Sequence, residues 1–375
     1  MPVEFIGYVA PREASEIIVP QGPAVDRRWI STVAKAHEAV GFDRALVAYG
    51  STGPDAQQIA AWAAHETRTL KLLLAHRPGF VFPTLAARQL ATLDHFSRGR
   101  LAVHIISGGS DVEQRKDGDW LDHDARYART AEYLAVLRRA WSATTPFDHG
   151  GPLYPLKDSF SGVKPLQQVA GQPQLPIFFG GASEAAIRVA GQQADVYALW
   201  GEPLAEVAQT IAAVRAAAAP HGRERHIGFS LSLRPIIAPT EEEAWAKAHS
   251  ILARARGVVG SSPRWAGRLG QVPANVGSQR LLAAAARGKV LDARLWTEIS
   301  ALTGAAGNST ALVGTPEQVA ESLLAYHDLG VNHFLIRGFT PLQDALDYGR
   351  ELIPLVRQEV ARRDAAATAP AAVAA

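Results

Sequence analysis

Eight short apolar runs recur along this chain of 375 residues and alternate with segments of helical pattern, and this alternation most constrains the fold. Most runs are apolar on successive residues, which is typical of parallel strands buried on both faces. The predicted strands are residues 3–10, 44–49, 71–76, 101–107, 175–179, 195–200, 227–237 and 333–337. Eight strands alternating with helices in a chain of this length predict an α/β protein with a (β/α)8 TIM barrel. A doubly wound open sheet is the alternative.

Helix signals separate the predicted strands. Pro203 precedes an apolar stripe of helical spacing and is predicted to open a helix. Residues 315–318 form a capping box with proline at the first helical position, and Gly330 is suited to end that helix. Residues 240–243 form a second capping box. These signals place helices after the predicted strands, as a barrel requires.

Two stretches interrupt the alternation. Residues 142–174 are rich in proline and glycine, and the longer insertion, residues 257–310, separates the seventh and eighth strands around a helical piece near 279–287. The insertion is interpreted either as a solvated surface segment or as a mobile lid over an anionic ligand. Its six cations are Arg264, Arg268, Arg280, Arg287, Lys289 and Arg294. Residues 1–360 are predicted to form one domain, followed by a disordered, alanine-rich tail at 361–375.

Composition excludes several classes of function. Lys and Arg number 38 against 36 Asp and Glu, so the net charge of +2 does not indicate a nucleic-acid or membrane-surface partner. The chain has 0 Cys, which excludes disulfides, thiolate metal sites and cysteine nucleophiles. No apolar run is long enough to span a membrane, and the N-terminus carries Glu4 without a signal-peptide pattern. A cytoplasmic location is the expectation.

Chemistry in such a barrel is located where strands end and the following loops begin. The residues at those positions are Tyr8, Tyr49, Gly50, His76, Ser107, Gly108, Gly109, Gly180, Gly181, Trp200, Gly201, Arg234, Arg337, Gly338 and Phe339. Paired carboxylates for a glycosidase and a cluster of metal ligands are both missing there, although the loop acids Asp55 and Asp111 remain available. This aromatic, glycine-rich and mildly basic lining favours a large, flat, anionic cofactor.

The fifth predicted strand runs into Gly180 and Gly181, and a helix is expected to begin near Ser183. Small residues and a helix N-terminus suit a phosphate, but the same pattern also describes a tight turn. His76 is interpreted either as a structural residue or as a cofactor contact, and a metal role is not expected. The acids at 122–124 are explained by helix capping, whereas Tyr127 is a candidate to reach a phosphate.

Several segments together resemble the bacterial luciferase-like flavin monooxygenases, within them the alkanesulfonate monooxygenase group. They occur in family order over nearly the whole chain: Arg77-Pro78, Pro83-Thr84 through Arg88-Gln89 to Thr92-Leu93-Asp94, Gly99-Arg100, Leu121-Asp122-His123, Arg126-Tyr127, Val163-Lys164-Pro165, Phe179-Gly180-Gly181-Ala182-Ser183, Trp200-Gly201-Glu202-Pro203 and Thr310-Ala311-Leu312-Val313-Gly314.

The resemblance implies a TIM barrel that receives reduced FMN (FMNH2) from a separate NAD(P)H-dependent flavin reductase. Such enzymes use O2 to oxygenate a small organic substrate through a flavin peroxide. By resemblance, Gly181, Ala182, Ser183 and Tyr127 would hold the FMN phosphate, with His76 and Ser107 near the ring. Arg234 and Trp200 are the candidate catalytic residues, while Tyr8, Arg280 and Phe339 would face the substrate or belong to the lid. A homodimer or homotetramer is expected.

Departures from the sulfonate enzymes concern the substrate. The family cysteine after the second strand falls on Gly53, and the family arginine and histidine of the seventh strand fall on Ser232 and Arg234. The tyrosine after the eighth strand falls on Phe339, and the lid arginine falls near Ala305. Either Arg234 and the lid cations bind an anion differently, or the substrate is not an alkanesulfonate. A structural ion pair is the competing explanation for Arg234.

The leading hypothesis is therefore a two-component FMNH2-dependent monooxygenase acting on a small organosulfur or related substrate, alkanesulfonate-like or sulfone-like. A deazaflavin (F420)-dependent oxidoreductase of the same barrel superfamily is the first alternative, and it would not need O2. A catalytically silent flavin-binding barrel is the second.

Overall fold

The computed structural model describes residues 2–171, 174–261, 273–306 and 310–368. Within these residues eight parallel strands close into a barrel: β1 (Glu4–Tyr8), β2 (Arg44–Val47), β3 (Lys71–His76), β4 (Leu101–Ile105), β7 (Ile177–Gly180), β8 (Val196–Trp200), β9 (Gly228–Ile237) and β13 (His333–Ile336). The barrel closes because β13 pairs with β1. The predicted TIM barrel is confirmed, and this closure excludes the open sheet.

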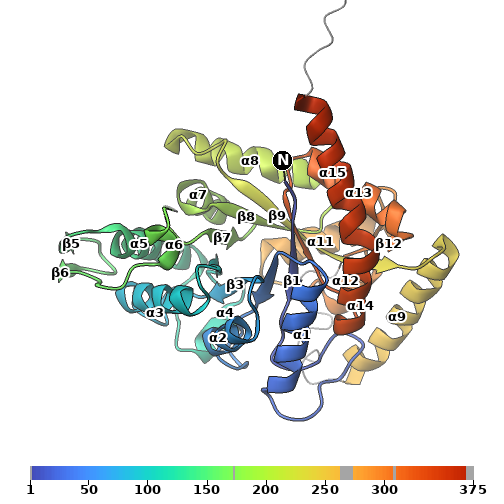
Figure 1. Cartoon of the computed structure of the whole chain (residues 1–375), viewed down its shortest axis with the longest axis horizontal. Coiled ribbons are helices and arrows are strands. Elements are labelled where there is room, and N and C mark those ends of the chain that lie inside the picture. Colours follow the sequence, from blue (N-terminus) through green and yellow to red (C-terminus); the bar gives the residue numbers. More distant parts are fainter. Residues whose placement is uncertain (1, 172–173, 262–272, 307–309, 369–375) are drawn as a thin grey trace, which may run out of the picture.

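Helices flank the barrel on its outside (Figure 1). They are α1 (Arg27–Ala39), α2 (Ala56–Glu66), α3 (Pro83–Phe96), α4 (Asp111–Lys116), α5 (His123–Ser142), α6 (Leu166–Val169), α7 (Glu184–Gln193), α8 (Leu204–Ala218), α9 (Glu241–Ser261), α11 (Val276–Arg287), α12 (Glu298–Thr303), α13 (Pro316–Asp328), α14 (Pro341–Asp347) and α15 (Ile353–Thr368). A 3-10 turn, η1 (Ala219–His221), follows α8, and a π-helical turn, η2 (Tyr348–Leu352), joins α14 to α15.

Side-chain caps start many of these helices close to the carboxyl ends of the strands. Asp55 accepts a hydrogen bond from Gln58 N at 2.8 Å and so begins α2, and Ser183 accepts one from Ala186 N at 3.2 Å and begins α7. The predicted capping box of α13 is present, with Thr315 as its N-cap. These caps satisfy N–H groups that the first helical turn leaves unpaired. They fix where each loop ends.

The seventh barrel strand extends beyond the barrel. The first half of β9 pairs with β8 and β13, whereas its last residues pair with β12 (Ala311–Gly314). Two short antiparallel strands, β11 (Leu295–Trp296) and β10 (Val290–Leu291), continue this sheet outward. The long insertion is thereby hydrogen-bonded to the barrel wall.

Both interrupting stretches contain more regular structure than the sequence indicated. The first forms a hairpin of β5 (Phe147–His149) and β6 (Leu156–Ser159), followed by α6, and in Figure 1 this hairpin projects beyond α5. In the second, α9 continues to Ser261, α11 covers the predicted helical piece, and α12 lies between β11 and β12. Helix α15 continues to Thr368, into the predicted tail, while residues 369–375 lie outside the described ones.

The apolar core of the described residues includes a cluster inside the barrel, a larger one outside it, and a third that packs α9 and α12 on the extended end of β9. Ile6, Leu73, Ala102, Phe178 and Val196 fill the inside of the barrel, and a larger cluster packs the strands against the surrounding helices. In the described part of the chain, no helix has both the length and the apolar character that crossing a membrane requires.

Candidate functional site

The segment after β7 forms a tight cradle with α5 and α7. Gly181 has a φ of +145°, and a Cβ there would lie 2.5 Å from the Tyr127 hydroxyl and 2.7 Å from the Ala186 side chain. Only glycine fits this position. Tyr197 donates its hydroxyl hydrogen bond to the Gly181 carbonyl oxygen. The predicted phosphate residues therefore meet at one point, where Ser183 also opens α7.

Tyr127 faces this cradle from α5. Its side chain is buried, and burial raises its pKa, although a hydrogen bond with Ser183 acts in the opposite direction. The hydroxyl is therefore neutral at ordinary pH and remains a hydrogen-bond donor. A neutral donor, a serine hydroxyl and the first turn of a helix together suit an anionic oxygen. The described residues of the cradle thus fit a phosphate group.

His76 and Ser107 end neighbouring strands, and both already have protein partners. His76 Nε2 lies 2.7 Å from the Tyr133 hydroxyl, and Ser107 Oγ lies 2.9 Å from Thr130 Oγ1. Burial lowers the pKa of His76 to about 4, so the imidazole is neutral at pH 7. In the part of the chain that the structure describes, no group of three or more His, Cys, Asp or Glu could hold a metal ion.

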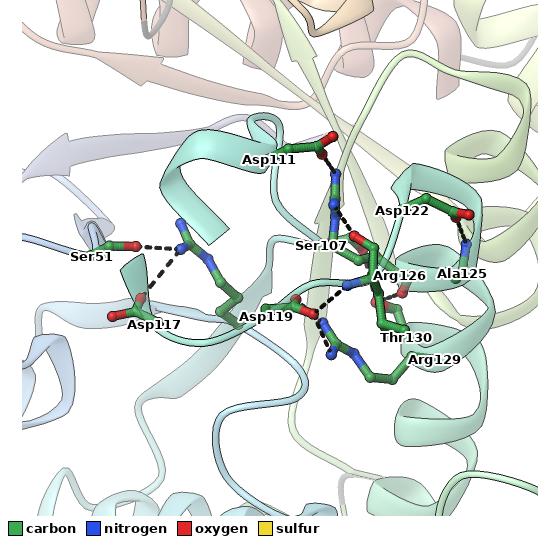
Figure 2. A network of polar contacts seen from close by, with 12 residues as sticks. Ser51, Ser107, Asp111, Asp117, Asp119, Asp122, Ala125, Arg126, Arg129 and Thr130 are labelled. Atoms are coloured by element: carbon green, nitrogen blue, oxygen red, sulfur yellow. Dashed lines mark hydrogen bonds and ion pairs between the residues drawn. The ribbon is translucent and has the colours of Figure 1, made fainter. Parts of the chain in front are cut away.

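Acidic residues reach the carboxyl ends of the strands through α4, a contribution that the strand ends alone did not reveal. Figure 2 shows Asp111 pointing toward Arg126 of α5 at one end of α4, and Asp117 near Ser51 at the other. The Arg126–Asp111 ion pair measures 2.8 Å. Arg77, whose side chain is buried, pairs with Glu113 of α4 at 3.2 Å. Since these partners are distant in sequence, no local pattern could have identified the network.

Arg234 forms the ion pair that was the competing explanation for it. The Glu16 carboxylate lies 2.8 Å from its Nη2, and both side chains are buried. Burial alone would raise the pKa of Glu16, but the charges of Arg234 and Arg337 lower it to about 2. The guanidinium also donates to the Arg337 and Gly338 carbonyl oxygens and lies 3.8 Å from the centre of the Phe339 ring. The positive charge of Arg234 is thus neutralised within the protein.

Tyr8 belongs to the same corner of the molecule. The Arg337 guanidinium lies 5.3 Å from the centre of the Tyr8 ring, and a pocket is lined by these two residues with Glu16 and Arg234. Two candidate substrate residues, Tyr8 at the end of β1 and Phe339 after β13, therefore lie near the candidate catalytic residue Arg234, which is inside β9. Sequence reasoning missed Glu16, because nothing in its own loop indicates a partner on the seventh strand.

The insertion is fastened to the end of β8. A Cβ at Gly277 of α11 would lie 3.3 Å from the Trp200 ring, so this helix packs closely on the candidate catalytic tryptophan. Arg280 binds Glu202 through two hydrogen bonds of 2.7 and 2.6 Å. Thr310 Oγ1 donates to the Gly201 carbonyl oxygen at 2.7 Å. Helix α11 is therefore fixed beside the residues that follow β8.

The described cations of the insertion are all paired with carboxylates. Besides Arg280, Arg287 lies 2.5 Å from Glu206, Lys289 lies 3.4 Å from Glu298, and Arg294 lies 3.1 Å from Glu241. Arg264 and Arg268 lie outside the described residues. The described insertion thus presents compensated charge rather than a basic surface to the barrel.

The closed ring of eight parallel strands with flanking helices defines a TIM-barrel protein. A family model described as luciferase-like monooxygenase matches residues 5–333. The chain belongs to this family.

Solved structures share the fold at low sequence identity. A riboflavin lyase (RcaE) with modified FMN and its substrate riboflavin has a TM-score of 0.78 at 19% identity, covering 96% of this chain and 92% of its own. DmoA from Hyphomicrobium sulfonivorans has a TM-score of 0.75 at 20% identity, and the match covers 96% of this chain and 89% of DmoA. A long-chain alkane monooxygenase (LadA) has a TM-score of 0.74 at 18% identity, with coverage of 97% of this chain and 92% of its own. An F420-dependent secondary alcohol dehydrogenase has the fold as well, with a TM-score of 0.67 at 17% identity and coverage of 95% and 99%.

Proposed function

We propose that this protein is a two-component monooxygenase that uses reduced FMN and O2 to oxygenate a small organosulfur compound. The proposal is carried by the family match over residues 5–333 combined with the cradle at Gly181. In a flavin enzyme the cofactor supplies the redox chemistry, and the protein contributes binding, orientation and the exclusion of water. The reduced cofactor would come from a separate NAD(P)H-dependent flavin reductase in the cytoplasm.

The cradle supports a proposed role for each residue around it. Ser183, Tyr127 and the backbone of Gly181 and Ala182 would bind the FMN phosphate, because a phosphate needs several donors directed at one point. His76 ends β3 and Ser107 follows β4, and both are held by partners on α5, the helix that also carries Tyr127. These two residues would orient the ring rather than exchange protons with it, since His76 is neutral throughout the working pH range.

The insertion is assigned the role of a lid. Helix α11 packs on Trp200 and is fixed by Arg280 to Glu202, which places a layer of protein beside the end of β8. Covering the site in this way would exclude water from the reduced cofactor and the substrate. Trp200 would then form part of the wall against which both are held.

The charges around the site favour an uncharged substrate, such as a sulfone, over an alkanesulfonate. The guanidinium of Arg234 is neutralised by Glu16, and the described insertion cations have carboxylate partners. A sulfonate bound here would have to displace one of these ion pairs. Phe339 and Tyr8 instead offer aromatic surface to a small organic molecule.

The test is an anaerobic titration with reduced FMN, followed by mixing with air-saturated buffer while flavin absorbance is recorded. We expect micromolar binding, and with the substrate and a reductase present, product formation that requires O2. Binding of F420 with O2-independent turnover would support the alternative, which the F420-dependent neighbour of the same fold motivates. NADPH consumption that yields only hydrogen peroxide with every substrate would indicate a silent barrel. Light scattering would decide between the proposed dimer and tetramer.

A further inference from the structure

Helix α4 is held beside the loop after β4 by polar contacts at both ends, an ion pair at one end and a hydrogen bond at the other. Ser110 caps it, and Asp111 in its first turn pairs with Arg126 of α5 at 2.8 Å. At the other end Asp117 accepts a hydrogen bond from the Tyr49 hydroxyl at 3.3 Å. Figure 2 shows Asp111 and Asp117 at opposite ends of the short helix. The backbone of α4 is therefore fixed, and with it the residue that the helix places at the loop after β4.

That residue is Gln114, and its side chain has no hydrogen bond. It is 0% exposed, and both Nε2 and Oε1 are buried without a partner among the described residues. It packs on Gly108, where a Cβ would lie 2.1 Å from Nε2. Gly108 also has a φ of +97°, so this contact depends on glycine for two reasons. The loop after β4 is thus shaped to accommodate this carboxamide.

Packing alone does not explain a glutamine at this position. A leucine or methionine would fill similar space without burying an unpaired donor and an unpaired acceptor, both of which destabilise the protein. Buried polar groups in proteins are nearly always hydrogen-bonded, so an exception calls for a partner from outside the protein chain. Gln114 follows Ser107 at the barrel end where ligands of this fold bind. The unpaired carboxamide is therefore available for recognition.

We propose that Gln114 is a specificity-determining residue that binds the pyrimidine edge of the flavin through a donor–acceptor pair of hydrogen bonds. A carboxamide presents one donor and one acceptor side by side, and it is matched by a group with an acceptor beside a donor. The imide edge of a flavin, with N3–H between two carbonyl groups, has this pattern. A phosphate or a sulfone has only acceptors. The inference rests on the proposed function, because it requires that the protein binds a flavin.

Because both polar atoms are buried, the carboxamide must rotate from Gly108 toward the ligand when the cofactor binds. In the ligand-free protein this carboxamide has no hydrogen bonds to lose, whereas an exposed group would give up its bonds to water. Each hydrogen bond to the ligand therefore contributes more to the affinity. This predicts opposite effects for an apolar substitution. Gln114→Leu should stabilise the ligand-free protein, since it removes the unpaired groups, and should weaken flavin binding, since it removes the recognition.

The experiment compares wild type, Gln114→Leu and a control, Lys116→Leu, which changes an exposed residue of the same helix. Thermal unfolding of the ligand-free proteins tests the first effect. Dissociation constants for reduced FMN and for FMN methylated at N3 test the second, because methylation removes the donor of the imide edge. We expect wild type and Lys116→Leu to bind FMN about tenfold more tightly than the methylated analogue, as two neutral hydrogen bonds allow. Gln114→Leu should bind both equally weakly.

Several outcomes would overturn the inference. A lower melting temperature for ligand-free Gln114→Leu would mean that the carboxamide stabilises the fold, and equal discrimination in all three proteins would mean that another residue recognises the edge. The deazaflavin ring of F420 keeps the same imide edge. If wild type binds F420 in place of FMN, the inference therefore holds when Gln114→Leu lowers the affinity for F420 and fails when it does not. If wild type binds neither cofactor, the proposed function fails and the inference fails with it. If the protein binds flavin but Gln114→Leu prefers FMN over the N3-methylated analogue as strongly as wild type does, the inference fails and the proposed function still holds.

Discussion

The ion pair that fastens α11 to the end of β8 allows a quantitative prediction. Glu202 is buried, with 7% of its side chain exposed, whereas Arg280 is 33% exposed. Removing one member of a fully buried pair costs about 3–5 kcal/mol, and an exposed pair contributes about 0–1 kcal/mol. Because solvent screens the arginine side, we expect Arg280→Met to lower the free energy of unfolding by about 2 kcal/mol. Urea unfolding followed by tryptophan fluorescence measures this difference.

The chain offers a matched control on the same helix. Arg287 pairs with Glu206 at 2.5 Å, but 53% of its side chain is exposed, so Arg287→Met should cost at most about 1 kcal/mol. The double variant Glu202→Met with Arg280→Met should recover part of the stability, since no unpaired carboxylate then remains buried. If Arg280→Met is no more destabilising than Arg287→Met, the ion pair does not hold α11 in place.

The same variants test the lid. If α11 excludes water from the site, Arg280→Met should increase the fraction of NADPH electrons that appears as hydrogen peroxide in the reconstituted reductase assay. Arg287→Met should leave this fraction near the wild-type value. An unchanged fraction in Arg280→Met, together with the expected loss of stability, would show that α11 is a structural element rather than a lid.

Three further predictions concern the cradle and the buried titratable groups. Ser183→Asp should abolish FMN binding, because it places a carboxylate beside the phosphate. Helix α7 should still form, because aspartate also caps helices well. Retained FMN affinity in a fluorescence titration would mean that the phosphate does not bind at Ser183. The pKa of Glu16 is lowered from 4.5 to about 2, so the stabilising effect of its charge is present above pH 4.5 and disappears as the pH falls toward 2. Glu16→Gln should therefore make the free energy of unfolding, measured with urea, depend less on pH between 4.5 and 2. Burial lowers the pKa of His76 from 6.5 to about 4, so the unfolded chain takes up the proton first. The free energy of unfolding therefore falls as the pH decreases from 6.5 to 4. His76→Gln should reduce the slope of this free energy against pH, and an unchanged slope would mean that the imidazole is not buried in solution.

Local sequence patterns were sufficient for the elements and for part of the site. Successive apolar residues identify the barrel strands because a parallel strand is covered on both faces, and capping boxes such as that at Thr315 identify helix starts because the cap is a local interaction. The cradle could be predicted for the same reason, since Gly181 and Ser183 are two residues apart in sequence. Tyr127 comes from α5; the sequence named it as a residue able to reach a phosphate, and only the family resemblance joined it to Gly181 and Ser183.

Contacts between distant segments could not be predicted in this way. The pairing of Glu16 with Arg234 and the position of α4 over Gly108 depend on how the loops pack after the barrel has closed. The insertion shows the same limit, because its cations suggested a basic lid, whereas folding brings carboxylates such as Glu202 and Glu206 beside them.

The sequence by itself therefore determined the barrel, the helix starts and the glycine-rich cradle, because each follows from periodicity or from contacts a few residues apart. The tertiary structure alone decided which charges are neutralised, how α11 packs on Trp200, and that Gln114 is buried without a partner. These properties depend on distances between segments far apart in the chain, and such distances exist only once the barrel has closed.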